Sequence, residues 1–330
     1  MNTMRVLLVL VILGLGGAIS GAAMAAEVDR GGYGDAILIP YFDVNNVDTL
    51  ISIESNILEF QVVRVRFRSA NTGVDALAFT LCLAPAGSWT AGMSFNGATA
   101  RVVSSSSMLA DGASGLDRLL AGNTTRGYIE VIGLREGGAT PAVCSDPFQG
   151  DDTSNSSLLA RTYYVAAAST PILAFGTNAI ALRDFSTVEL PESATMFGDA
   201  GVAEALILNS NFSGTYFASR FFISPPMQAE TKIVLTFPAG AGGCPFCTIP
   251  GELLITPFAD GGTQLPPLTR PAGQVVSVIT LTGADITAAE GSFVLEATTF
   301  DPLPAVALII QTTSSSAAIF FNVLFQGQLF

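Results

Sequence analysis

The sequence predicts an all-β protein, built as an antiparallel β-sandwich of jelly-roll or immunoglobulin-like type or as two packed sandwich halves. Short apolar runs recur along the chain and are separated by Gly, Pro, Asn and Asp, which favour turns. Several runs alternate apolar and polar residues, as half-buried strands do. Only the stretch from Met108 to Leu120 has the leucine spacing of a short helix.

The clearest strand is residues 62–68. Its two sides are Val63, Val65 and Phe67 on one and Arg64, Arg66 and Arg68 on the other. The chain has 27 acidic and 14 basic residues, so we expect the arginines to pair with carboxylates on a neighbouring strand rather than to bind an anionic ligand. Further strands are expected at 36–42, 50–54, 77–83, 126–134, 161–166, 203–208, 215–223, 232–237, 252–256, 274–281, 292–298, 305–311 and 319–325.

Residues 1–25 have the pattern of an export signal. Arg5 supplies the positive charge, Val6 to Leu15 is apolar, and Ala23-Met24-Ala25 is a small-x-small cleavage site. The rival interpretation is a transmembrane anchor, but the apolar run is short for a membrane span. We therefore expect an exported protein, extracellular or at the cell surface, with the periplasm as second choice.

The rest of the chain divides at a polar stretch. Residues 26–134 form the N-terminal sandwich part, 135–157 a long polar loop or linker, and 158–330 the C-terminal sandwich part. The length allows one large domain or two ordinary ones. Both arrangements stay open at the level of the sequence.

Composition narrows the range of partners. The net charge is −13, and loss of the leader with Arg5 makes the exported chain one unit more negative. Such a chain repels nucleic acid and anionic lipid, so we expect neither as a partner, and no membrane span is expected after cleavage. With 49% hydrophobic and 12% charged residues, part of the surface is expected to be buried against copies of the same chain, as a homo-oligomer or polymer.

Four cysteines in an exported chain predict disulfides. Three connectivities exist, and the preferred one joins Cys82 to Cys144 and Cys244 to Cys247. The Cys244-Pro245-Phe246-Cys247 spacing also occurs in thiol-redox motifs, but glycines precede it and no helix start follows. A structural loop clip is the preferred interpretation.

Asp43, Asn45 and Asp48 offer oxygen ligands in one short loop. Calcium is the metal such a loop would hold, although the spacing matches no defined calcium loop and a plain turn is preferred. No other cofactor is expected. The chain has no histidine, so Ser-His-Asp and Cys-His catalysis are excluded and only carboxylates or thiols remain. We expect a protein that is not an enzyme.

The C-terminal run is apolar on both faces of a strand. Such a strand must be covered on both sides, so it is either a central core strand or inserts into a neighbouring subunit. A terminal Phe also occurs in outer-membrane β-barrels, which is a further alternative. The residues expected to carry self-assembly are Ile319, Phe321, Val323, Phe325 and Leu329.

Four blocks of the chain resemble a loosely defined group of exported proteobacterial cell-surface proteins. They are Gly32–Phe42, Thr49–Ile53, Val65–Arg68 and Trp89–Ala91. The resemblance implies export and a β-rich body and transfers no catalytic residue.

The function expected from the sequence is a structural, cell-surface role with self-association into a filament or surface layer. The alternative is a surface or periplasmic binding module for a glycan, a peptide or calcium. In that case Trp89 and the 135–157 loop are the contact candidates.

Overall fold

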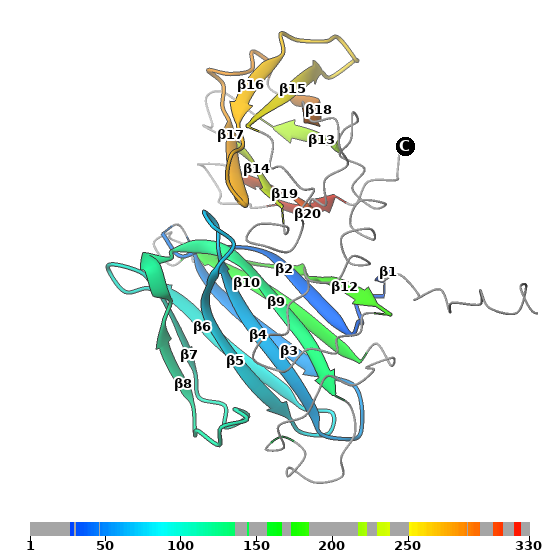
Figure 1. Ribbon diagram of the computed structural model, residues 1–330. Coiled ribbons are helices and arrows are strands. Elements are labelled where there is room, and N and C mark those ends of the chain that lie inside the picture. The colour runs from blue at the N-terminus through cyan, green and yellow to red at the C-terminus, as the bar shows by residue number, and fades with distance from the viewer. Residues whose placement is uncertain are drawn as a thin grey trace, which may run out of the picture.

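The computed structural model describes residues 27–29, 31–45, 47–135, 144, 157–166, 173–184, 217–222, 230–237, 251–288, 290–297, 306–312 and 320–324. Within these ranges the regular structure is antiparallel strands and one 3-10 turn, η1 (Ala121–Asn123). The all-β prediction is confirmed. Figure 1 shows the strands in two bodies, a larger one below and a smaller one above.

The larger body is a sandwich of two six-stranded sheets. Sheet A has the strand order β1-β12-β2-β9-β4-β5, and sheet B has the order β11-β10-β3-β6-β7-β8. The bounds are β1 Glu27–Asp29, β2 Ala36–Asp43, β3 Asp48–Ser55, β4 Gln61–Ser69, β5 Asp75–Leu83, β6 Ser88–Phe95, β7 Ala100–Ser104, β8 Leu116–Leu119, β9 Arg126–Arg135, β10 Leu158–Ala166, β11 Leu173–Asn178 and β12 Ile180–Arg183.

Alternation along each strand explains the core between sheets A and B. On β4, Val63, Val65 and Phe67 point inward and are fully buried, as the period-two pattern predicts. Trp89 enters the same core from β6, with its ring 5.5 Å from that of Phe79. Trp89 is therefore buried, and its expected role as a surface contact is wrong.

The smaller body is a second sandwich, of two four-stranded sheets. Sheet C has the order β13-β18-β15-β16, and sheet D has the order β17-β14-β19-β20. Leu235 and Phe293 are among the residues buried between them. The bounds are β13 Phe217–Phe222, β14 Glu230–Thr236, β15 Glu252–Ala259, β16 Leu268–Pro271, β17 Val276–Leu281, β18 Glu290–Ala297, β19 Val306–Thr312 and β20 Phe320–Leu324.

The two sandwiches share a further apolar cluster. Leu38 and Ile132 on the outer face of sheet A pack in one buried cluster with Val276 and Leu308 of sheet D. The sheets are therefore layered in the order B, A, D, C, which explains why β2 is buried along its whole length. Pro40 lacks an amide donor, and the β2–β9 register shifts beside it; its carbonyl accepts a 2.5 Å hydrogen bond from Thr236 Oγ1 of sheet D.

Two expectations are corrected. The helix expected at 108–120 is wrong: Leu116–Leu119 is edge strand β8, because Leu116 fills the sandwich core while its neighbours face solvent. Of the two interpretations of 135–157, the domain linker is wrong, since β10, β11 and β12, which follow it, complete sheets A and B of the first sandwich. Within the part of the chain that the structure describes, no helix has the length and apolar character needed to cross a membrane.

Candidate functional site

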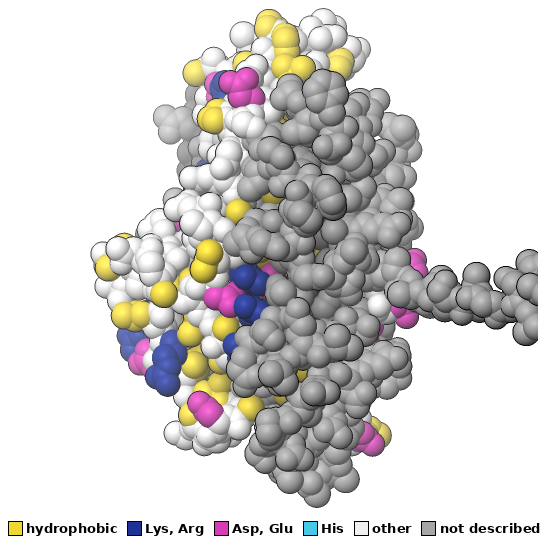
Figure 2. All heavy atoms as spheres, viewed as in Figure 1, with side chains coloured by type: hydrophobic (Ala, Val, Ile, Leu, Met, Phe, Trp, Pro, Cys, Tyr) yellow, Lys and Arg dark blue, Asp and Glu magenta, His cyan; other side chains and the backbone are white. Residues whose placement is uncertain are grey.

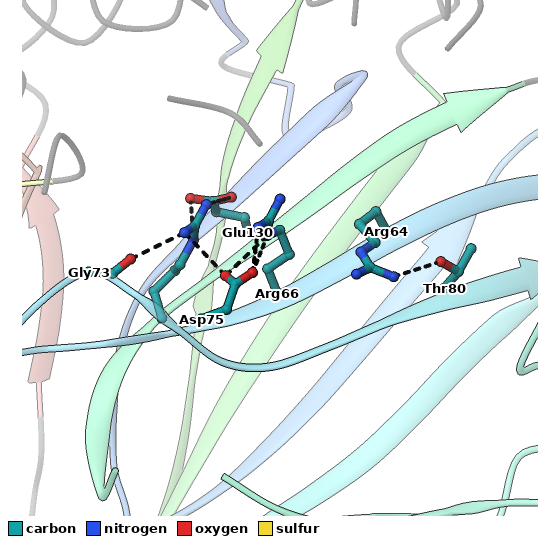
Figure 3. A network of polar contacts seen from close by, with 7 residues as sticks. Arg64, Arg66, Gly73, Asp75, Thr80 and Glu130 are labelled. Atoms are coloured by element: carbon teal, nitrogen blue, oxygen red, sulfur yellow. Dashed lines mark hydrogen bonds and ion pairs between the residues drawn. The ribbon is translucent and has the colours of Figure 1, made fainter. Parts of the chain in front are cut away.

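The arginine side of β4 lies on the outer face of sheet A and is engaged by neighbouring strands (Figure 3). Arg66 Nε lies 3.1 and 3.0 Å from the two carboxylate oxygens of Asp75 on β5. Arg64 Nη1 donates to Thr80 Oγ1 at 3.0 Å. The expected pairing of these arginines with carboxylates is therefore confirmed for Arg66, which binds Asp75, and for Arg68, which binds Glu130.

Arg68 and Glu130 form a bidentate pair between β4 and β9. The distances are 3.0 Å from Nε to Oε1 and 3.1 Å from Nη2 to Oε2, and Glu130 is fully buried. Burial lowers the pKa of Arg68, but the charge of Glu130 and its hydrogen bond outweigh this, so the pKa is raised. A charge buried in this way depends on its partner, because either one alone would lack solvation.

The same arginine anchors the β4–β5 turn. Arg68 Nη1 donates to the carbonyl of Gly73 at 3.2 Å, and Gly73 N donates to the carbonyl of Ser69 at 2.8 Å. Gly73 has φ +66°, a left-handed conformation that favours glycine. The ion-pair network thus fixes the backbone of residues 69–74, and this turn forms one wall of a pocket.

The pocket, called here the Asp43 pocket, has a volume of about 250 Å³ and lies at one end of the first sandwich. Three separate stretches build it: the end of β2, the β4–β5 turn, and the segment from η1 to β9. Its lining is mainly polar. The lining residues are Asp43, Asn45, Ser69, Ala70, Asn71, Gly122, Asn123, Thr124, Thr125 and Arg126.

Asp43 is the buried acidic group of this pocket, at 5% exposure. Its Oδ2 accepts a hydrogen bond from Tyr41 Oη, and its Oδ1 accepts one from the backbone N–H of Asn45, both at 3.1 Å. Asn45 Nδ2 in turn donates to Thr125 Oγ1 at 2.8 Å, which ties the β2 end to the third wall. Burial, together with the charge of Asp43, raises the pKa of Tyr41, which therefore remains a neutral donor to the carboxylate.

Arg126 supplies the positive charge of the pocket. It is the register partner of Asp43 in the β2–β9 ladder, so the two side chains are cross-strand neighbours. Its Nη2 donates a hydrogen bond to Gln274 Oε1 of the second sandwich at 2.8 Å. Nearby, the carbonyl of Ala70 accepts one from the backbone N–H of Val276 at 3.0 Å. The pocket therefore lies where the two sandwiches meet.

The structure brings two of the three expected calcium ligands together. Asp43 and Asn45 line the pocket, whereas Asp48 lies on β3 and is not part of the lining. The positive charge of Arg126 in the same pocket opposes a divalent cation. Among the described residues, no group of three or more His, Cys, Asp and Glu side chains is arranged to hold a metal. Calcium binding remains a prediction.

A second surface, the outer face of sheet B, exposes apolar side chains that sequence patterning did not single out. Tyr163 pairs with Leu50, Leu50 with Gly92, and Gly92 with Val103, so these four residues form one row across four strands. Tyr163, Leu50 and Val103 are 40%, 46% and 42% exposed. Leu119 on β8, the register partner of Arg101, is 52% exposed. Outward strand positions in a sandwich are usually polar, so this row is unusual.

An ion pair lies near each end of this apolar row, and Asp117 of the second pair is the register partner of Val103. Arg161 Nη1 is 4.0 Å from Glu54 on the β10–β3 side. On the β7–β8 side, Arg101 binds Asp117 through two bonds of 2.8 and 2.6 Å, and this hydrogen bonding lowers the pKa of Asp117. Figure 2 shows basic and acidic side chains gathered at the β7–β8 edge of the first sandwich.

The other expected site residues have mixed outcomes. The Cys82–Cys144 disulfide is confirmed, and it joins two cysteines with a sequence separation of 62. Cys244 and Cys247, and most of the 135–157 loop, lie outside the described residues. Phe321 and Val323 are in β20, which pairs with β19 at the end of sheet D; Ile319, Phe325 and Leu329 lie outside the described residues.

Comparison with known proteins adds no function. No protein-family model matches the sequence, and no curated protein matches it significantly. The apo form of a Pleurotus ostreatus lectin is 11% identical, over 91% of this chain and 84% of the lectin, with a TM-score of 0.16. A TM-score this low carries no argument. The class that the described residues define is an all-β protein of two packed sandwiches.

Proposed function

We propose that the chain is an exported, non-catalytic structural protein that associates with copies of itself through the outer face of sheet B. The observation that carries the proposal is the exposed row of Tyr163, Leu50 and Val103 in direct register. Exposed apolar side chains aligned on a flat surface gain free energy when a second surface removes them from water.

The shape of this face favours close contact. Gly92 and Gly176 leave the strands without side chains beside Leu50 and Tyr163; a Cβ on Gly176 would lie 2.9 Å from Tyr163 Cε1. The tyrosine ring therefore lies against its neighbour's backbone and presents a broad apolar surface. Large, stiff aromatic side chains of this kind contribute strongly at interfaces because little conformational entropy is lost when they are buried.

The charges on this face suit a second copy of the same chain. A chain of net charge −13 repels itself over most of its surface, but here each arginine has an adjacent carboxylate. The Arg101–Asp117 and Arg161–Glu54 pairs lie near opposite ends of the apolar row. In a symmetric dimer with its two-fold axis in the plane of this face, Arg101–Asp117 of one copy would lie over Arg161–Glu54 of the other copy. Each charge could then lie close to an opposite charge of the partner.

The area sets the expected strength. Six strands have five spacings of about 4.8 Å, and with about seven residues of 3.3 Å rise per strand they give a face of roughly 600 Å² per copy. The total of about 1,200 Å² is at the lower end of specific interfaces, so we expect a weak, concentration-dependent dimer. Growth into a filament or layer needs a second contact, for which the C-terminal strand remains our proposal.

Export and lack of catalysis belong to the same proposal. The leader-like segment and the Cys82–Cys144 disulfide support an oxidising compartment. The absence of histidine from the sequence supports a non-catalytic role.

The test is sedimentation velocity of the mature protein over a concentration series. A dimer fraction that rises with concentration supports the proposal, whereas a monomer at every concentration would overturn it.

A further inference from the structure

We infer that the Asp43 pocket is a binding site for a neutral polyol, specifically a single sugar unit of a glycan. This site is separate from the self-association face, and the inference does not rest on the proposed function. Its volume of about 250 Å³ suits one small polar molecule rather than an extended ligand.

The charge balance of the pocket selects a neutral ligand. Asp43 and Arg126 are cross-strand neighbours, so their opposite charges largely offset each other within the pocket. Arg126 disfavours a cation at this position and Asp43 disfavours an anion. An uncharged ligand is repelled by neither side chain.

The hydrogen-bonding groups select a ligand rich in hydroxyls. Asp43 accepts, Arg126 donates, and the side chains of Asn45, Asn71, Asn123, Thr124 and Thr125 do both. Vicinal hydroxyls also donate and accept from adjacent atoms, so each can bridge two such groups. Asp43 and Arg126 already hold protein partners, which fixes their orientation for a ligand before it binds.

The position of the pocket agrees with a recognition role. Loops at the end of a sandwich and junctions between domains are common ligand sites, and this pocket is at both. The Arg68–Glu130 pair holds the β4–β5 turn rigid, so Asn71 is presented on a fixed backbone.

The experiment is saturation-transfer difference NMR on the mature protein. The neutral probes are glucose, galactose, mannose, N-acetylglucosamine and inositol. Glycine and calcium chloride are the charged comparison ligands, and their binding is tested by the shift of the melting temperature. We expect saturation transfer to at least one neutral probe. Asn71→Ala should weaken its binding about two- to tenfold, the effect of one hydrogen bond. Arg126→Lys, which keeps the charge but not the fork of donors, should also weaken it.

Asn56→Ala is the matched control. Asn56 is an exposed asparagine that follows the C-terminal end of β3, and it does not line the pocket. It should leave binding unchanged, and the melting temperature of each variant verifies folding. Absence of transfer to every neutral probe, equal binding by wild type and Asn71→Ala, or stabilisation by glycine or calcium alone would each overturn the inference. Sedimentation is independent of all these outcomes, so failure here is distinguishable from failure of self-association.

Discussion

Arg68 and Glu130 face each other across β4 and β9 on the outer side of sheet A, joined by two hydrogen bonds of 3.0 and 3.1 Å. The carboxylate is fully buried. The same guanidinium holds Gly73 and lies 3.1 Å from Asp75, so one ion pair links three strands and the turn that forms the pocket wall.

Glu130→Gln should strongly destabilise the first sandwich. The substitution leaves Arg68 buried with only part of its compensating charge, and breaking a buried pair in this way costs about 3–5 kcal/mol. Urea unfolding followed by the fluorescence of Trp89, the only tryptophan in the chain and part of this core, measures the loss. The two sandwiches need not unfold together, so a probe inside the first one is required.

Asp117→Asn provides the matched control for that experiment. Asp117 also binds its arginine through two hydrogen bonds, but the pair is exposed. Exposed pairs contribute little to stability, so the unfolding midpoint should not change. Equal shifts for the two variants would contradict the account of the buried pair.

Removing the Cys82–Cys144 disulfide should destabilise the same sandwich. The bond closes a loop with a sequence separation of 62, for which chain entropy gives a contribution of about 4 kcal/mol. Cys82→Ala/Cys144→Ala should therefore lower the urea midpoint reported by Trp89. An unchanged midpoint would show that the bond does not constrain the unfolded chain as argued.

Three buried tyrosines predict a loss of stability in alkali. Burial raises the pKa of Tyr41, Tyr128 and Tyr164, and nearby Asp43 and Glu130 raise the first two further. In the unfolded chain they ionise near pH 10, whereas in the folded state they stay neutral. The free energy of unfolding is therefore unaffected by these groups below pH 10 and decreases above it. With all three tyrosines contributing, the decrease is about 4 kcal/mol per pH unit.

Paired measurements of phenolate absorbance and far-ultraviolet circular dichroism check this pH dependence. The phenolate signal of the buried tyrosines should appear only together with the loss of β-structure. Ionisation of all tyrosines while the β-signal stays intact would contradict it. Tyr164→Phe should make the alkaline unfolding less steep by removing one of the three groups.

Period-two patterning predicted most of the strands because it depends only on neighbouring residues. It located the core side of β4, and the acidic excess correctly predicted partners for Arg66 and Arg68. Helical spacing was misleading at 108–120, where three leucines suggested a helix. There Leu116 meets the core through pairing of β8 with β7, a tertiary contact that outweighs local spacing.

The candidate sites depend on contacts between distant segments and were only partly predictable. Asp43 and Asn45 were found as neighbours in one loop, but Arg126 and Asn71 carry no local signal because separate loops bring them to the pocket. Leu50 had a weak signal, an apolar residue at an outward position between Thr49 and Ile51. Its meaning required the register with Tyr163 and Gly92, which the sequence does not contain.

The most direct test of the central claim compares Leu50→Asp with Leu58→Asp by sedimentation velocity. Leu50 lies in the apolar row of sheet B, whereas Leu58 is 83% exposed in the loop after β3 and is not a member of the row. Both variants add one negative charge at an exposed leucine. The account predicts that Leu50→Asp abolishes the concentration-dependent dimer while Leu58→Asp associates as wild type does. Equal association by the two variants would contradict self-association through the outer face of sheet B.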